Sequence, residues 1–338
     1  MPKKSELEFA NFILRFGQDR VLMDYLEEIV IPAFSSGLER SYGETTYFFH
    51  DVEILNLGSS EIPVLCIAGR YIKNTVVKRE QIFNEENNEL IKDSGSLHTS
   101  PSAVFILILN NHRLIYLSET SHAPNLLSFQ ATAAKFIKDK YHEFISDLYQ
   151  QNRHRGVTKA SLYREHEPPS LEVVSLTSEE TIGEFISQYS LLKTVEIKLL
   201  TTNNELDNND FFRQARQIKE EAHANTTTIT HNNGKEGLSK GAVTRQLESA
   251  LSQGNSRVKL KGKDRQGNKL EGSNEKFKIK SQMPEIPQAI VGIAGRGYAI
   301  FQSLVDQGTI CLGENRENVT DKIKQLWDKL HQDSQENE

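Results

Sequence analysis

Basic side chains gather in one short stretch of this sequence, residues 257–280 (RVKLKGKDRQGNKLEGSNEKFKIK). The stretch holds nine Lys and Arg against three acids, although the whole chain has a formal net charge of −6. Ammonium and guanidinium groups gathered in this way can neutralise the phosphates of a nucleic acid. The candidate DNA-binding residues are Arg257, Lys259, Lys261, Lys263, Arg265, Lys269, Lys276, Lys278 and Lys280.

The spacing of these residues predicts a β-hairpin with one cationic face. Strand side chains alternate between faces, so the bases of 257–263 point away from Val258 and Leu260. A second strand with alternating Lys is expected at 276–280, and 264–268 is typical of the connecting turn. Such a face contacts phosphates without reading bases, and about six neutralised phosphates predict a slope of log affinity against log salt of about −5. The alternative is a solvated outer face whose charges prevent edge-to-edge strand pairing.

A second pattern, Glu196-Ile197-Lys198, resembles half of a nuclease centre. In such a centre a carboxylate binds magnesium and the lysine supports the attacking water. A further acid is needed on an adjoining strand, and Glu172 is the best placed. The alternative function is therefore a magnesium-dependent nuclease that uses Glu196 and Lys198. Because Glu-x-Lys is frequent on strands by chance, binding is favoured over catalysis.

The remaining motifs indicate neither a cofactor nor a metal. The glycine-rich segment 292–297 (GIAGRG) lacks the Gly-Lys-Ser/Thr ending of a P-loop and the spacing of the dinucleotide fingerprint. It predicts a turn or a close backbone approach. The ten histidines are scattered, and Cys66 and Cys311 alone do not form a structural zinc set. We expect no cofactor, no metal and no catalytic residue.

Composition indicates a soluble globular protein. The chain has 338 residues, enough for two domains, and is 37% hydrophobic and 25% charged. Its longest apolar run, 103–109 (AVFILIL), is strand-sized and far short of the roughly 18 residues that a membrane helix needs. The charged N-terminus does not resemble a signal peptide and the cysteines suggest reduced thiols, so a cytoplasmic location is expected.

Hydrophobic periodicity predicts an α+β protein with two mixed domains. The first, residues 1–150, is expected to be an antiparallel meander sheet with helices; 151–170 is a basic, proline-containing linker; and 171–338 is an α/β domain of alternating strands and helices that carries the basic hairpin. Strands are expected at 45–57, 63–72, 103–109, 113–118, 171–176, 193–200, 226–230 and 309–312. Helices are expected at 20–31 (ending at Pro32), 125–148, 178–190, 210–224, 240–251 and 318–330.

Four segments, taken in order, resemble the RexA family, the cytoplasmic sensor proteins of temperate-phage superinfection exclusion. They are 45–55 (TTYFFHDVEIL), 102–129 (SAVFILILNNHRLIYLSETSHAPNLLSF), 170–200 (SLEVVSLTSEETIGEFISQYSLLKTVEIKLL) and 257–270 (RVKLKGKDRQGNKL). The last is the most specific, because the Lys263-Asp264 step and Gly267 recur at the same place in the turn. The chain departs from the family in its lysine-rich strands and in an added segment, 284–338.

The resemblance implies a dimeric, sequence-independent DNA-binding protein of antiviral defence. It implies action in phage exclusion, a form of abortive infection, together with a small membrane-channel partner. Besides the nuclease, a third reading stays open: a non-catalytic protein-interaction scaffold whose cationic face meets an acidic protein.

Overall fold

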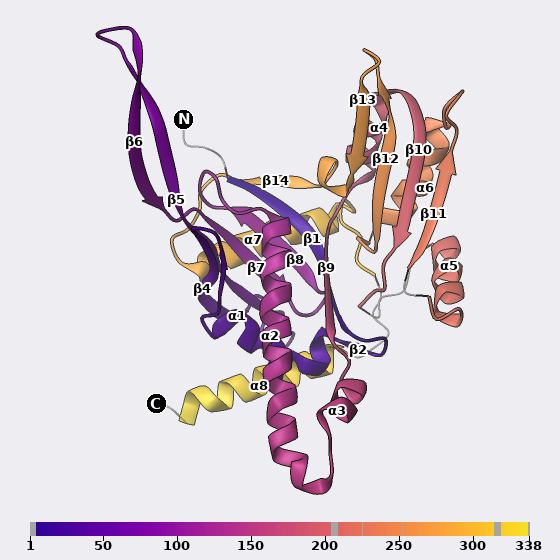
Figure 1. The fold of residues 1–338 in the computed structure, drawn as a ribbon. Helices are drawn as coiled ribbons and strands as arrows, with labels where there is room; N and C mark the ends of the chain where they lie inside the picture. Colours follow the sequence, from indigo (N-terminus) through magenta and orange to yellow (C-terminus); the bar gives the residue numbers. More distant parts are fainter. Residues whose placement is uncertain (1–4, 204–208, 225, 252, 314–318, 337–338) are drawn as a thin grey trace.

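A computed structural model shows an α+β protein built on two antiparallel sheets, as the sequence predicted (Figure 1). The structure describes residues 5–203, 209–224, 226–251, 253–313 and 319–336. No helix in these ranges is both long enough and apolar enough to span a bilayer.

The large sheet is a curled antiparallel meander centred on the buried strand β7. Its main path runs in the order β14-β1-β8-β7-β5-β4-β3, while β2 and β9 pair with β1 and β6 pairs with β5. The strands are β1 (Ser5–Phe16), β2 (Arg20–Val21), β3 (Glu39–Tyr42), β4 (Thr45–Asn56), β5 (Leu65–Asn84), β6 (Glu89–Thr99), β7 (Ser102–Ile108), β8 (Arg113–Ser118), β9 (Pro169–Ser175) and β14 (Lys280–Met283).

Helices cover both faces of this sheet, which explains the unbroken apolar sequence of β7. Phe105 and its alternate neighbours pack under the long helix α2 (Leu126–Asn152), which Asn125 caps by accepting from the Ser128 N–H at 2.9 Å. Ile106 and its alternate neighbours pack against α7 (Ile290–Asp306). A strand buried on both faces cannot alternate apolar with polar residues. The first face also receives α1 (Ile31–Ser35), the short helices η1 (Leu22–Tyr25) and η2 (Leu26–Val30), and α8 (Val319–Glu336).

Among the residues that the structure describes, the small sheet has helices on one face only. Its strand order is β11-β10-β12-β13, from β11 (Thr227–Asn232), β10 (Tyr189–Leu199), β12 (Ser256–Asp264) and β13 (Lys269–Ser273). The helices are α4 (Glu179–Ser187), α5 (Asp210–Glu221) and α6 (Lys240–Leu251). Apolar residues of β10 and β12, such as Val195 and Leu260, form a core with Phe185 and Leu247 of the helices.

The small sheet is an insertion in the large one, between β9 and β14. Both of these strands pair with β1, and α7 and α8 pack on the large sheet. The second sheet with its helices therefore spans about residues 178–277, which is narrower than the predicted second domain, 171–338. The predicted linker, 151–170, contains the short helices η3 (Arg153–Arg155) and α3 (Lys159–Glu165).

Three local predictions are corrected by the structure. Segment 292–297 lies inside α7 rather than in a turn, although a Cβ on Gly297 would lie 3.0 Å from Ile106 Cδ1, which is the predicted close approach. Pro32 occupies the first turn of α1 instead of ending a helix, because proline is tolerated there. No strand forms at 309–312, all of which the structure describes.

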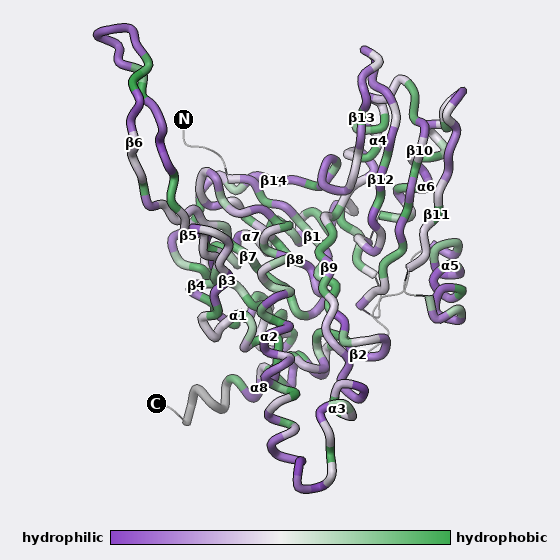
Figure 2. Tube along the Cα trace, in the orientation of Figure 1, coloured by the Kyte–Doolittle hydropathy of each residue, from purple (hydrophilic) through white to green (hydrophobic). Residues whose placement is uncertain are grey.

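A two-stranded ribbon made of the outer parts of β5 and β6 projects from the large sheet (Figure 1). It carries exposed apolar residues, and Figure 2 shows apolar stretches along an otherwise hydrophilic ribbon. Cross-strand pairs account for most of them: Val77 with Leu97, Ile82 with Ile91 and Phe83 with Leu90. An isolated ribbon of this kind gains little stability from its own packing, so its apolar side chains are available for a partner.

His112 at the β7–β8 turn is expected to make the protein's stability sensitive to acid. The ring is 1% exposed, and neither ring nitrogen has a hydrogen-bond partner among the described residues. Burial, followed by the nearby Arg113, lowers the pKa of His112 to about 4. The unfolded state binds a proton near pH 6.5 and the native state only near pH 4, so stability falls as the pH drops through this window.

We expect this histidine to cost about 2 kcal/mol of folding stability between pH 7 and pH 5. Asparagine tolerates the positive φ of 55° at this position, so His112→Asn keeps the turn and removes the titrating group. Urea unfolding at the two pH values is expected to show a smaller loss of stability in the variant than in the wild type. Equal losses in both proteins would assign the acid sensitivity to other groups.

Candidate nucleic-acid interface

Strand β12 presents the alternation that its sequence predicted. Val258 and Leu260 are buried in the core, while Lys259, Lys261 and Lys263 are exposed on the opposite face. Among the described residues, no acid lies within ion-pair distance of Lys261 or Lys263, and Lys259 lies 4.0 Å from Glu196. Three ammonium groups therefore follow one another along the uncovered face of the small sheet.

Neighbouring strands add two further lysines to this face. Residues directly opposite each other in an antiparallel pair share a face. Lys198 of β10 lies opposite Arg257, and Lys269 of β13 lies opposite Lys263. The sequence alone assigns Lys198 only to the nuclease motif, because local spacing does not reveal that β10 pairs with β12. We call this set the basic face: Lys198, Arg257, Lys259, Lys261, Lys263 and Lys269.

The turn between β12 and β13 forms where it was predicted. Asp264 Oδ1 accepts from the backbone N–H groups of Gln266 and Asn268, both at 2.9 Å, and Gly267 has a φ of 86°. Side-chain acceptance of this kind is typical of Asx turns. The turn places Arg265, which is exposed, at the tip of the hairpin next to the basic face.

Three of the nine predicted DNA-binding residues lie outside the hairpin, which is a correction to the sequence analysis. The second hairpin strand is 269–273, not 276–280. Lys276 is in the short helix η4 (Asn274–Lys276), and Lys280 opens β14 and pairs with Glu6 at 2.8 Å. Lys278 is only 15% exposed and pairs with Glu8 at 2.7 Å and Glu275 at 3.3 Å.

Arg257 is held at the seam between the two sheets. Its guanidinium donates to Glu172 Oε2 at 2.5 Å and to Gln130 Oε1 at 3.3 Å. Glu172 is on β9 of the large sheet and Gln130 on α2. Arg257 therefore fixes the small sheet to the rest of the molecule, and only part of its guanidinium faces solvent.

Acids reduce the charge of the basic face without cancelling it. Glu196 and Glu271 share the face with its six cations. Lys269 lies 2.7 Å from Glu271, and its hydrogen bond and charge, followed by the charge of Lys261, lower the pKa of that carboxyl. The exposed pairs Lys259–Glu196 and Lys269–Glu271 contribute little energy, so Lys259 and Lys269 can each exchange a carboxylate for a phosphate.

The nuclease motif does not assemble a metal site. Glu196 lies beside Lys259 and Glu172 is paired with Arg257, so each carboxylate faces a cation. Within the described ranges, no group of three His, Cys, Asp or Glu residues could hold a metal ion.

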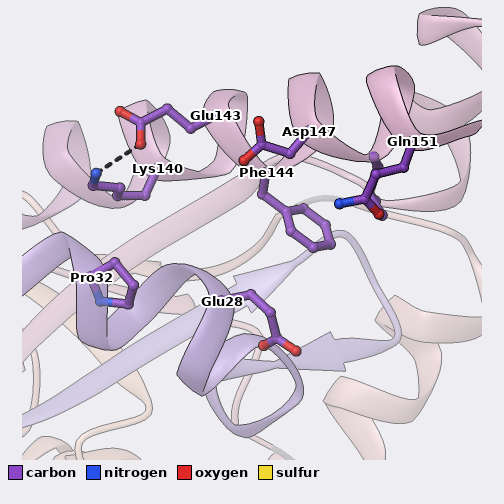
Figure 3. A pocket seen from close by; sticks show the side chains of 8 residues that line it. Glu28, Pro32, Lys140, Glu143, Phe144, Asp147 and Gln151 are labelled. Carbon is purple, nitrogen blue, oxygen red and sulfur yellow. Dashed lines mark hydrogen bonds and ion pairs between the residues drawn. The ribbon is translucent and has the colours of Figure 1, made fainter.

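A groove of about 470 Å³ between α2 and the η2–α1 segment has the opposite character (Figure 3). Its acids are Glu28, Glu143 and Asp147. Lys140 pairs with Glu143 at 2.7 Å, and the ring of Phe144 also lines the groove. Carboxylates at its mouth repel phosphates, so it does not extend the basic face.

The architecture defines an α+β protein in which an inserted sheet, covered by helices on one side, presents basic residues on the other. Residues 27–289 match the family model described as "Domain of unknown function (DUF4747)", and the chain belongs to this family. The match begins after β1 and ends before α7, so it includes the whole small sheet. A search of curated proteins found no match.

Proposed function

We propose that this protein binds DNA through the phosphate backbone, without strong sequence preference, and acts in phage superinfection exclusion. The observation that carries the proposal is the row of exposed Lys259, Lys261 and Lys263 on an uncovered sheet face, flanked by Lys198 and Lys269. Charge gathered on one face of an otherwise acidic protein steers a polyanion to that face.

The chemistry of the face favours backbone contacts over base recognition. The described residues that share it on β10 and β11 include Thr194, Thr228 and Thr230, whose hydroxyls can donate to phosphate oxygens. Its members on the four strands include no aromatic residue on which an unstacked base could stack. Double-stranded DNA, with its regular array of phosphates, is therefore the expected ligand.

Salt dependence of binding tests the proposal. Six cations less two acids leave about four charges, so the slope of log affinity against log salt is expected to be about −3.6. The affinity of a labelled duplex, measured by fluorescence anisotropy, then falls about 150-fold between 50 and 200 mM salt. Two duplexes of unrelated sequence are expected to give the same curve. Binding that does not change with salt would contradict the proposal.

Two further assays separate the alternatives. Supercoiled plasmid with Mg²⁺ is expected to be retarded on a gel and to stay intact; nicking that Glu196→Gln abolishes would make the protein a nuclease. If the cationic face instead meets an acidic protein, that protein would displace labelled DNA from it. Failure to bind DNA at any salt concentration would leave the protein-interaction scaffold as the function.

The exclusion setting rests on the resemblance described above, which also implies a homodimer and a membrane-channel partner. We place the dimer contact on the projecting β5–β6 ribbon, because its apolar pairs lie outside the core. Light scattering is expected to give the mass of two chains. A monomer at micromolar concentration would remove the dimer from the proposal and leave DNA binding to be judged separately.

A further inference from the structure

The small sheet ends at an edge strand, β11, that lacks the features which normally prevent pairing with another strand. Its six residues, TTITHN, include no charged residue of the Lys, Arg, Asp or Glu type and no proline, and it pairs with β10 in one unbroken register. Native edge strands usually carry charges, prolines or bulges. The opposite edge strand, β13, has Lys269 and Glu271, and β3 of the large sheet has Glu39 and Arg40.

The outward backbone groups of β11 belong to Thr228, Thr230 and Asn232. The Asn233 N–H donates to the Lys193 carbonyl at 2.8 Å, and hydrogen-bonded pairs alternate along an antiparallel ladder. Every second residue of β11 therefore bonds to β10, and these three point away from it. Within the described ranges, no other group bonds to their N–H or C=O groups. The edge is thus open to a further strand.

Two copies of this edge complement each other about a two-fold axis. When Thr230 faces Thr230 of the partner subunit, Thr228 faces the partner subunit's Asn232. Each facing pair can then exchange two backbone hydrogen bonds. Cross-strand threonine pairs are favourable, and no like charges from the two strands meet. The edge therefore fits a second copy of this chain.

The helix beside this edge adds exposed apolar surface. Phe212 of α5 and Ile229 of β11 belong to the same core, and Figure 1 shows α5 at the β11 side of the small sheet. Phe211 and Ile218 of this helix are 52% and 64% exposed. They are seven residues apart and so lie on one face of the helix, where an added copy can cover them.

We propose that β11 pairs antiparallel with β11 of a second copy and that DNA promotes this pairing. The two four-stranded sheets would become one sheet of eight strands. Thr230 lies opposite Glu196, which lies opposite Lys259, and residues opposite each other share a face. Both basic faces therefore lie on the same side, with their β12 rows five strand spacings apart, about 24 Å. A duplex that crosses the strands can contact both.

DNA is needed because the contact is weak by itself. A six-residue edge with two apolar side chains is expected to bury less than the about 1,200 Å² of a stable interface, and two basic faces on one side repel each other. A duplex offsets this repulsion and raises the local concentration of neighbouring copies. DNA binding would then be cooperative, while the β5–β6 ribbon provides the dimer contact in free solution. The cooperativity rests on the proposed DNA binding, whereas the edge pairing can be measured without DNA.

Fluorescence anisotropy on two duplexes tests the cooperativity. A hairpin stem of about 8 base pairs is roughly 27 Å long, enough for one small sheet but not for two, whereas about 40 base pairs hold several copies. A longer duplex offers more binding positions to any non-specific binder, so the long-to-short affinity ratio is compared between proteins. Thr230→Pro removes an outward N–H and leaves the bonds to β10, and it is expected to lower this ratio at least about tenfold.

Thr230→Val is the matched control, because it keeps the N–H and loses only a hydroxyl on the basic face. It is expected to keep the wild-type ratio. His231→Lys is a second edge variant, which also serves if circular dichroism shows Thr230→Pro to be misfolded. It keeps every backbone group and adds a positive charge on the helix side, so a lower ratio cannot come from weaker attraction to DNA.

Sedimentation equilibrium without DNA separates the edge contact from the proposed function. At about 0.5 M salt, which screens the basic faces, and at hundreds of micromolar protein, the wild type and Thr230→Val are expected to have a higher average mass than the two edge variants. That result without any DNA binding would keep the edge contact and remove DNA binding. If the proteins bind DNA, equal length ratios in all four would overturn the proposal; if none binds DNA, equal masses would.

Discussion

Reversing Lys259, Lys261 and Lys263 together to Glu is expected to weaken DNA binding at least about 100-fold at 50 mM salt. Each lysine that contacts a phosphate contributes about one unit to the salt slope. Reversal leaves three cations against five acids on the face, so the slope is expected to fall from about −3.6 to near zero. The three side chains point into solvent from a strand whose apolar residues lie on its other face, so the fold is expected to stay intact.

The matched control changes the net charge by the same amount elsewhere. Lys135, Lys138 and Lys324 are exposed on α2 and α8 of the large sheet, and their reversal to Glu is expected to leave the salt slope near its wild-type value. Circular dichroism and thermal unfolding verify folding in both triple variants. Equal losses of affinity in the two proteins would mean that net charge, not the basic face, governs binding.

A strand's own residues were enough to predict the exposed part of the basic face. Period-two alternation fixes which side chains of β12 share a face, and the Asp264–Asn268 turn is a local signal. Both are confirmed. By contrast, Lys198 belongs to the face only because β10 pairs with β12, about 60 residues later in the chain. Pairing between distant strands is not encoded by local spacing.

The same limit explains what was missed in the large sheet. The apolar run of β7 predicts a buried strand, but it does not say that a helix about 190 residues later covers its second face. Once α7 is in place, Gly292, Gly295 and Gly297 serve as helix residues, and Gly297 lets the helix approach Ile106. A glycine-rich segment therefore has different local structures according to what packs against it.

The predicted position of Lys276, Lys278 and Lys280 on the hairpin is wrong. These lysines do alternate with buried apolar residues, but their segment does not pair with β12. After β13 the chain leaves the small sheet. The backbone of Lys278 forms an isolated antiparallel β-bridge with Thr177, and Lys280 begins β14, which pairs with β1. Lys278 pairs with Glu8 and Lys280 with Glu6, both at the other end of the sequence, while Glu275 adds a local partner for Lys278. A basic stripe was thus divided between two sheets.

Lys278→Glu is therefore expected to reduce stability, by about 3–5 kcal/mol. Burial acts to lower the pKa of Lys278, but hydrogen bonds and charge from Glu8 and Glu275 outweigh it and raise that pKa. The lysine is consequently charged at neutral pH, and its contribution is lost only as the pH rises above its usual value of 10.5. A glutamate in its place would leave three acids together at the seam.

Lys280→Glu provides the comparison two residues along the chain. Lys280 and Glu6 are 46% and 47% exposed, so solvent screens their pairing and the expected cost is about 1 kcal/mol. Urea unfolding at pH 7 measures both variants, and anisotropy measures their DNA affinity under conditions in which each is folded. We expect the Lys278 variant to unfold at much lower urea while its folded form still binds DNA. A variant as stable as the wild type that has lost DNA affinity would instead return Lys278 to the DNA interface and make the ion pairs with Glu8 and Glu275 incidental.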